Sequence, residues 1–291
     1  MSTTPMTEST NTAPTQTVGP VASGAPLLIC LPSINAEGLE TMRGRIAATL
    51  PGHTLFIASP GAGAPTSNGV TMVDYPQPSP GDGGWALTAT DYLGAAQLAA
   101  EYDAAVTFVL GTEAVSLSSA GLQALAESVL NDKADLALPR YQTGPHDALL
   151  SSALLYPVTN ALFGVPAHLP LALDVAFSAR MAKRLTTVAR KPNNASQADP
   201  LIWPVAEASI ASFTVKEIDA GTRTLPQPAE TDLNALLAEI VGSLFSDIEA
   251  KATFWQRARA PMPVKPSQEP KRTASEARIT SPPARVSSGT G

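Results

Sequence analysis

Residues 26–32, Pro-Leu-Leu-Ile-Cys-Leu-Pro, begin the part of the chain that decides the fold. This apolar run predicts a buried strand that ends at its second proline, since proline cannot donate to a β-ladder. Ser33 or Asn35 can cap the helix that the following pattern predicts over residues 37–50. A second apolar run, residues 53–58, predicts another strand. Strand, helix and strand in this order are typical of a parallel sheet with helices packed against it.

The alternation of apolar runs and helical patterns continues along the chain. Further strands are expected over residues 70–75, 105–110, 135–139 and 214–218, and further helices over residues 85–101, 120–130 (capped by Ser118), 147–163 (interrupted at Pro157), 176–188 and 233–255. We therefore expect an α/β fold with a mainly parallel central sheet, flanking helices and a long C-terminal helix.

The last predicted helix is amphipathic. We expect its apolar stripe to pack on the domain. The stripe consists of Leu233, Leu236, Leu237, Ile240, Leu244, Phe245 and Ile248.

Composition indicates one large folded region between two tails. Of the 291 residues, 44% are hydrophobic and 15% charged, which suits a sizeable core. Residues 1–25 and 261–291 are low-complexity segments, expected to be disordered, and residues 26–260 form the expected domain. The net charge is −6, and because the C-terminal tail is basic, the domain itself carries about −10, which repels nucleic acid.

The sequence predicts a protein of the reducing cytoplasm. Cys30 is the only cysteine, so it is expected as a small buried strand residue rather than as part of a disulfide framework. The N-terminal segment has neither a basic start nor an apolar stretch of the signal-peptide type. No apolar run approaches the length of a membrane span. The oligomeric state leaves no mark in the sequence.

Two motif-rich stretches carry a family resemblance. Residues 145–164 keep Asp147, Tyr156, Pro157, Thr159, Ala161, Leu162 and Gly164, and residues 169–178 keep Pro170, Asp174, Phe177 and Ser178. Together with Pro32-Ser-Ile-Asn35, these positions resemble bacterial GT-A glycosyltransferases of the mannosylglycerate synthase and glucosyl-phosphoglycerate synthase type. The resemblance covers about residues 26–255 and implies the GT-A fold.

The resemblance also implies a chemistry. Enzymes of this type transfer a sugar from a nucleotide-sugar donor to a small polar acceptor, with Mg²⁺ or Mn²⁺ stabilising the leaving diphosphate. It implies Asp174 as the catalytic residue, with a cap of the following helix as the alternative. Substrate contacts are implied for Pro32, Ser33, Asn35 and Asp147. Trp85 is a further candidate, because an indole ring can stack on a base or a sugar. The alternatives are a strand-to-helix turn for Ser33 and Asn35, a helix cap for Asp147 and a core position for Trp85.

Several positions depart from the family pattern. Gly111-Thr-Glu113 stands where the family has the metal-binding D-x-D, so Glu113 is the one metal ligand left there, or else a solvated loop residue. Five other positions are changed as well: Pro60, Asp82, Leu225 and the Ala172-Leu173 pair replace an aspartate, a lysine, a metal-binding histidine and two glycines. The sequence therefore predicts a glycosyltransferase-like protein whose activity is weakened or lost. The alternative is a non-catalytic binding or scaffold protein built on this fold, and Mg²⁺ or Mn²⁺ is expected only if the site still works.

Overall fold

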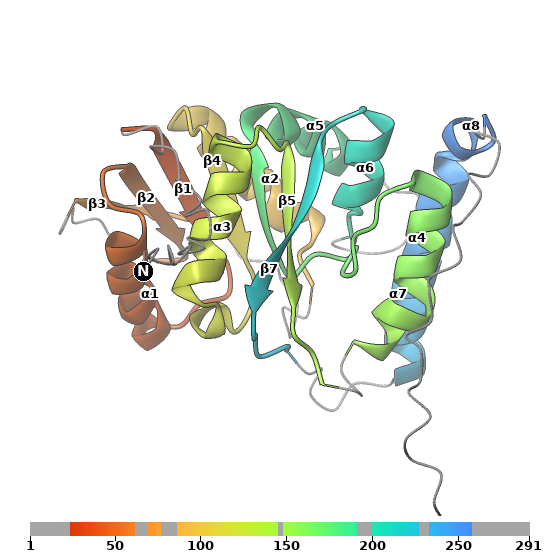
Figure 1. Cartoon of the computed structure of the whole chain (residues 1–291), viewed down its shortest axis with the longest axis horizontal. Helices are drawn as coiled ribbons and strands as arrows, with labels where there is room; N and C mark the ends of the chain where they lie inside the picture. Colours follow the sequence, from red (N-terminus) through yellow and green to blue (C-terminus); the bar gives the residue numbers. More distant parts are fainter. Residues whose placement is uncertain are drawn as a thin grey trace, which may run out of the picture.

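The computed structural model describes residues 24–61, 69–76, 86–144, 148–190, 200–226 and 233–257 (Figure 1). Its centre is a seven-stranded sheet in the order β3-β2-β1-β4-β6-β5-β7. The strands are β1 (Pro26–Cys30), β2 (Thr54–Ser59), β3 (Val70–Asp74), β4 (Val106–Leu110), β5 (Leu136–Tyr141), β6 (Asp174–Ser178) and β7 (Val215–Gly221). Only β6 runs antiparallel to its neighbours among these strands, so the predicted mainly parallel α/β sheet is confirmed. The expected tails lie almost entirely outside the described residues.

Helices cover both faces of the sheet. They are α1 (Ala36–Thr49), α2 (Ala89–Glu101), α3 (Ser119–Leu130), α4 (Tyr156–Phe163), α5 (Ala179–Ala189), α6 (Pro204–Ile210), α7 (Leu233–Ala250) and α8 (Ala252–Trp255). α1 and α3 pack on one face, and α2 and α5 pack on the other (Figure 1). Residues of β1 alternate between the two cores: Leu28 and Cys30 face α2, and Leu27 and Ile29 face α1. A strand covered on both faces is apolar throughout, which explains its uninterrupted apolar run.

A third apolar cluster lies beyond the β7 end of the sheet, where α4, α6 and α7 pack together (Figure 1). Trp203 is at its centre, 2% exposed, and its indole nitrogen donates to Ser243 Oγ at 3.1 Å. Ile240 and Leu244 supply the buried side of α7. Leu237 and Phe245 are 46% and 54% exposed, so their predicted place in the buried stripe is wrong. The long helix is also shorter than predicted, because it ends at Ala250 and the short α8 follows.

The helix predicted over residues 176–188 begins instead at Ala179. Residues 174–178 form β6, which inserts antiparallel between β4 and β5. Val175 and Phe177 enter one core and Ala176 the other, so the strand is buried on both sides. A short apolar run of this kind has no periodicity that separates a strand from a helix, and only its two strand neighbours decide between them.

The sequence predicted an interruption of a helix at Pro157, but the structure has none at this residue. Pro157 lies in the first turn of α4, and Leu155 and Tyr156 just before it keep right-handed helical backbone angles, so the helical segment continues through the proline. A π-helical turn over Ser151–Leu155 precedes it.

Two predicted helix caps are confirmed. Asn35 Oδ1 accepts the backbone N–H of Gly38 at 2.7 Å at the start of α1, and Ser118 Oγ accepts that of Gly121 at 3.0 Å at the start of α3. In the described part of the chain, no helix combines the length and apolarity needed to cross a bilayer.

Candidate functional site

Four segments meet where β4 ends. Leu110, the last residue of β4, pairs with Asp174, the first residue of β6, because these two strands are antiparallel. The carboxyl ends of β5 and β7 lie at the same end of the sheet as that of β4. One side chain there comes from the end of β5, and one from the segment after β7. Tyr141 closes β5, and Arg223 follows the last residue of β7 by two positions. The sheet thus brings residues 33 to 111 positions apart in sequence into contact at one point.

Asp174 is saturated with hydrogen bonds. Its Oδ2 accepts from Arg223 Nε at 2.8 Å and from the Tyr141 hydroxyl, and its Oδ1 accepts from Arg223 Nη2 at 3.0 Å and from the Gly111 N–H at 3.1 Å. Both side chains of the Arg223–Asp174 ion pair are 0% exposed. In this arrangement the carboxylate has no surface open to a substrate.

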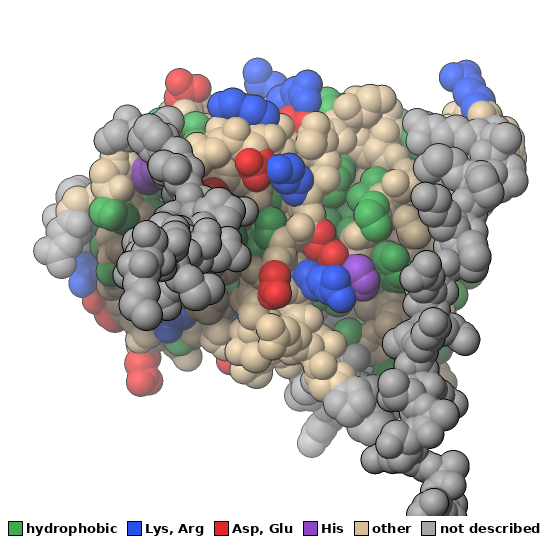
Figure 2. Space-filling view, viewed as in Figure 1, with side chains coloured by type: hydrophobic (Ala, Val, Ile, Leu, Met, Phe, Trp, Pro, Cys, Tyr) green, Lys and Arg blue, Asp and Glu red, His purple; other side chains and the backbone are tan. Residues whose placement is uncertain are grey.

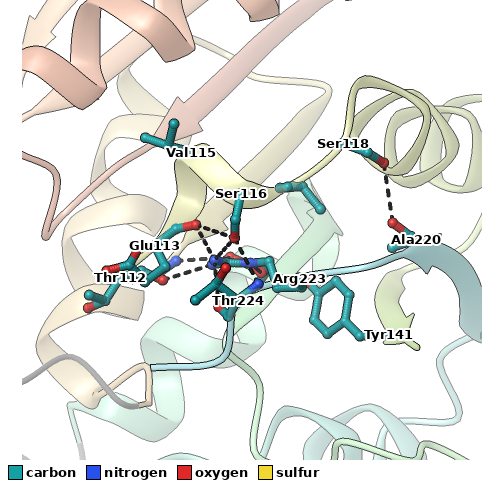
Figure 3. A network of polar contacts seen from close by, with 12 residues as sticks. Thr112, Glu113, Val115, Ser116, Ser118, Tyr141, Ala220, Arg223 and Thr224 are labelled. Atoms are coloured by element: carbon teal, nitrogen blue, oxygen red, sulfur yellow. Dashed lines mark hydrogen bonds and ion pairs between the residues drawn. The ribbon is translucent and has the colours of Figure 1, made fainter. Parts of the chain in front are cut away.

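Arg223 also binds the segment that follows β4 (Figure 3). Its Nη2 donates to the Thr112 carbonyl at 2.8 Å, and its Nη1 donates to Ser116 Oγ at 2.8 Å and to the Glu113 carbonyl. The carbonyl of Thr224 lies 3.2 Å from Nη1. With the two Asp174 oxygens, six oxygen atoms surround one guanidinium group. We call this set the Arg223 cage.

Arg223 keeps its positive charge in the cage, and Tyr141 keeps its proton. Burial alone lowers the pKa of Arg223, but its hydrogen bonds and charge interaction with Asp174 outweigh that effect and raise the pKa. Burial, and then the neighbouring Asp174 charge, raises the pKa of Tyr141 well above its ordinary value. The phenol therefore remains a hydrogen-bond donor at every physiological pH.

A second arginine holds the same segment from the opposite side. The 3₁₀ turn η1 (Ala114–Ser116) follows Glu113, whose backbone is left-handed with φ 63°. Arg45 of α1 donates from Nη1 to the carbonyls of Val115 and Leu117, both at 2.6 Å. The turn after β4 is thus fixed by α1 on one side and by the segment after β7 on the other.

The donor set at this edge does not fit the divalent ion that the family resemblance implies. Glu113 turns its carbonyl toward Arg223, while the residue as a whole is exposed. A Cβ added at Gly111 would lie 2.7 Å from the Leu173 carbonyl oxygen, so a carboxylate side chain cannot enter there without a backbone shift. Leu225 packs against the core. Within the described residues, no three His, Cys, Asp or Glu side chains are grouped to hold a metal.

The other predicted site residues fall in different places. Pro32 is buried at the end of β1, Ser33 is exposed, and Asn35 caps α1. Asp147 and Trp85 lie outside the described residues, as does Asp82. The alternative in which Asp174 caps a helix is wrong: Ser178 Oγ accepts the Met181 N–H at 3.3 Å and caps α5.

Neither Arg223 nor Tyr141 was predicted from the sequence as a site residue. Arg223 is the only charged residue in the segment Gly221–Pro226, which follows a strand and resembles the metal-histidine region. A lone cation beside a β-sheet needs a carboxylate or several carbonyls if it is buried. A lone arginine in such a segment therefore predicts a buried oxygen partner, but the sequence does not identify that partner.

A polar cavity of about 580 Å³ lies beside the network, at the β5–β7 edge of the sheet. Tyr141 belongs to both, and the other lining residues are Arg140, Gln142, Thr143, Glu217, Ile218 and Asp219. Figure 2 shows acidic, basic and histidine side chains gathered over this edge. Glu217 is anchored: its Oε2 lies 2.7 Å from His168 Nδ1, and its Oε1 accepts the His168 N–H at 2.6 Å.

Residues from the motif-rich stretches border this edge. The ring of Tyr156 stacks on His168 with centroids 4.6 Å apart and an angle of 8° between the planes. His168 is in turn bonded to Glu217 of β7. The start of α4 is thereby tied to the wall of the cavity.

The chain matches no protein-family model and no curated protein. Its similarity to solved structures includes a mycobacterial protein, at 12% identity over 78% of this chain and 76% of that one, with a TM-score of 0.50. Two structures of glucosyl-3-phosphoglycerate synthase from Mycobacterium tuberculosis are similar with TM-scores of 0.48. One, with Mn²⁺, uridine diphosphate and glucosyl-3-phosphoglycerate, is 14% identical over 77% of this chain and 80% of that one. The other, with Mn²⁺, uridine diphosphate and phosphoglyceric acid, is 15% identical over 77% and 78%. At these identities the likeness concerns the fold alone: an α/β fold with a mainly parallel sheet, which the chain shares with the mycobacterial protein.

Proposed function

We propose that this chain is a glycosyltransferase-like protein of the GT-A type in which metal-dependent sugar transfer has been lost, and which works as a binding protein. The observation that carries the proposal is the state of Asp174. Its side chain is 0% exposed, and it accepts hydrogen bonds from Arg223, Tyr141 and Gly111. A carboxylate with its oxygens occupied in this way is neither a metal ligand nor a group that contacts an acceptor.

The scarcity of metal ligands among the described residues at this site supports the same proposal. Stabilising a leaving diphosphate needs a divalent ion or an equivalent positive charge aimed at the phosphates. Mg²⁺ and Mn²⁺ need several hard oxygen ligands, and Glu113 offers one exposed carboxylate. The positive charge of Arg223 is directed inward to Asp174 and to backbone carbonyls instead.

The cavity beside Tyr141 is the proposed ligand site. It offers the exposed Arg140 together with the amide and hydroxyl of Gln142 and Thr143. The carboxylates of Glu217 and Asp219 line it as well, bonded to His168 and to the Gly221 N–H. One cation, two carboxylates and neutral hydrogen-bonding groups together suit a small polar ligand of the kind that acceptors and nucleotide sugars represent. Uridine diphosphate and phosphoglyceric acid, which occur in the similar synthase structures, are the first probes to try. We also propose a cytoplasmic location, as the sequence predicts.

Titration calorimetry tests the loss of metal-dependent chemistry. Uridine, guanosine and adenosine diphosphates are titrated into the full chain at fixed ionic strength, with and without Mn²⁺ or Mg²⁺. We expect no gain in affinity from the metal, and the same result in Glu113→Ala. A tenfold metal-dependent gain, about 1.4 kcal/mol, that disappears in Glu113→Ala would contradict the proposal.

A turnover assay addresses the second candidate, a working enzyme of the same type. The cavity is the observation in its favour, because a binding protein and an enzyme would use it alike. The full chain is incubated with a panel of nucleotide sugars and with phosphoglyceric acid, and release of nucleoside diphosphate is measured. Release that requires both the full chain and the acceptor would establish the enzyme.

A further inference from the structure

We propose that the Arg223 cage is a guanidinium-binding site, filled by the chain's own side chain, that locks the turn after β4 to β6 and β7 without a metal ion. Gly111-Thr-Glu113 and the segment around Leu225 are the two places where the resembled enzymes supply metal ligands. Arg223 joins these two places through the Thr112 and Glu113 carbonyls. The inference concerns folding and does not depend on whether the protein transfers sugar.

The chemistry of the cage suits a guanidinium group better than a divalent ion. Guanidinium is planar and directs five N–H donors outward, and here all three nitrogens find oxygen acceptors. A single carboxylate, that of Asp174, balances its single charge. A divalent ion among the same oxygens would leave one positive charge buried and unpaired, which is costly. The oxygens are also arranged around a planar group, whereas a metal ion needs ligands that converge on one point.

The cage joins parts of the chain that are far apart in sequence. Arg223 lies 110 residues from Glu113, 107 from Ser116 and 49 from Asp174. Ser116 Oγ also accepts the Thr224 N–H at 3.0 Å, so the segment after β7 is held at two successive residues. A cation at this one point therefore determines where the turn after β4 sits relative to Asp174.

Chemical rescue tests the inference. Arg223→Ala empties the cage but leaves the oxygens of Asp174, Thr112 and Glu113 in the chain. We expect the thermal unfolding midpoint of this variant to rise, and to saturate, with low-millimolar guanidinium chloride relative to sodium chloride at the same ionic strength, because a ligand that binds only the folded state stabilises it. Wild type and Arg43→Ala should show no rise. Arg43 is the matched control, since it forms only an exposed pair with Glu40.

Two further variants keep the test decisive. In Arg223→Ala/Asp174→Asn we expect the guanidinium effect to disappear, because the counter-charge is gone. If Arg223→Ala accumulates unfolded, its refolding yield from urea is compared in guanidinium and in matched sodium chloride, and the yield should be higher in guanidinium. Arg223→Lys, which keeps the charge but not the planar group, is measured beside it. No rescue in either measurement, or stabilisation by Mn²⁺ or Mg²⁺ that exceeds that by guanidinium, would overturn the inference.

Discussion

Arg223 and Asp174 form an ion pair from which solvent is wholly excluded, with Nε 2.8 Å from Oδ2 and Nη2 3.0 Å from Oδ1. The pair joins the segment after β7 to the first residue of β6. Both groups make further hydrogen bonds: the carboxylate accepts from Tyr141 and Gly111, and the guanidinium donates to backbone carbonyls. Such a pair is costly to break from one side, because the partner left behind is a buried charge.

Asp174→Asn should lower the free energy of unfolding by about 3–5 kcal/mol, because it leaves Arg223 buried without its counter-charge. Urea denaturation followed by circular dichroism measures the change. Tyr141→Phe removes one hydrogen-bond donor and no charge, so it should cost only about 1–2 kcal/mol. Equal losses in the two variants would show that the charge is not what matters.

Gly111→Ala should destabilise the protein by roughly 1–3 kcal/mol, because its Cβ would meet the Leu173 carbonyl oxygen at 2.7 Å. Gly242→Ala is the matched control. Gly242 lies inside α7 with no atom within 4 Å of an added Cβ, so alanine should stabilise the helix by about 0.5–1 kcal/mol. Thermal and urea unfolding of both variants decide the matter. A neutral Gly111→Ala would mean that the turn after β4 moves easily.

Leu244→Ala should cost about 2–5 kcal/mol, because Leu244 is 1% exposed in the cluster between α4, α6 and α7. Leu237→Ala, on the same helix, should cost less than about 1 kcal/mol, since Leu237 is 46% exposed. Both changes remove the same atoms from the same helix, so their difference in urea denaturation isolates burial. Similar losses would mean that the outer face of α7 is covered in solution.

Asp135 should make stability depend on pH in the acid range. Burial raises the pKa of its carboxyl, but hydrogen bonds from Arg180, the Thr214 N–H and Ser178 outweigh this and lower the pKa below the ordinary value near 3.8. A lowered folded pKa contributes stability above the unfolded pKa, and that stability is lost as the pH falls through the folded value.

The advantage of wild type over Asp135→Asn should therefore be full at pH 6 and shrink as the pH drops below about 4. Urea denaturation at a series of pH values measures it. Asp132→Asn is the control, because Asp132 forms an exposed pair with Lys216 and should contribute little at any pH. An advantage that stays constant down to pH 2 would show that the Asp135 carboxylate is not the group that titrates.

The sequence by itself determined the elements whose reasons are local. The apolar run of β1, the cap of α1 by Asn35 and the cap of α3 by Ser118 depend on neighbouring residues only, and all three were predicted. The mainly parallel sheet followed from the alternation of strands and helices over the first half of the chain. These features are encoded within a few residues, where hydrophobic periodicity and capping chemistry act.

Only the tertiary structure decided the features that need a distant partner. Residues 174–178 became a strand because β4 and β5 lie on either side of them, and α7 buries Leu244 rather than Phe245 because α4 and α6 cover that side. The Arg223 cage is the clearest case, since its oxygens come from positions up to 111 residues away. A guanidinium group can pair with any carboxylate, and spacing along the chain does not choose one. The choice of Asp174 is made when the ends of β4, β6 and β7 meet at one edge and exclude water, because there an unpaired charge is too costly to leave.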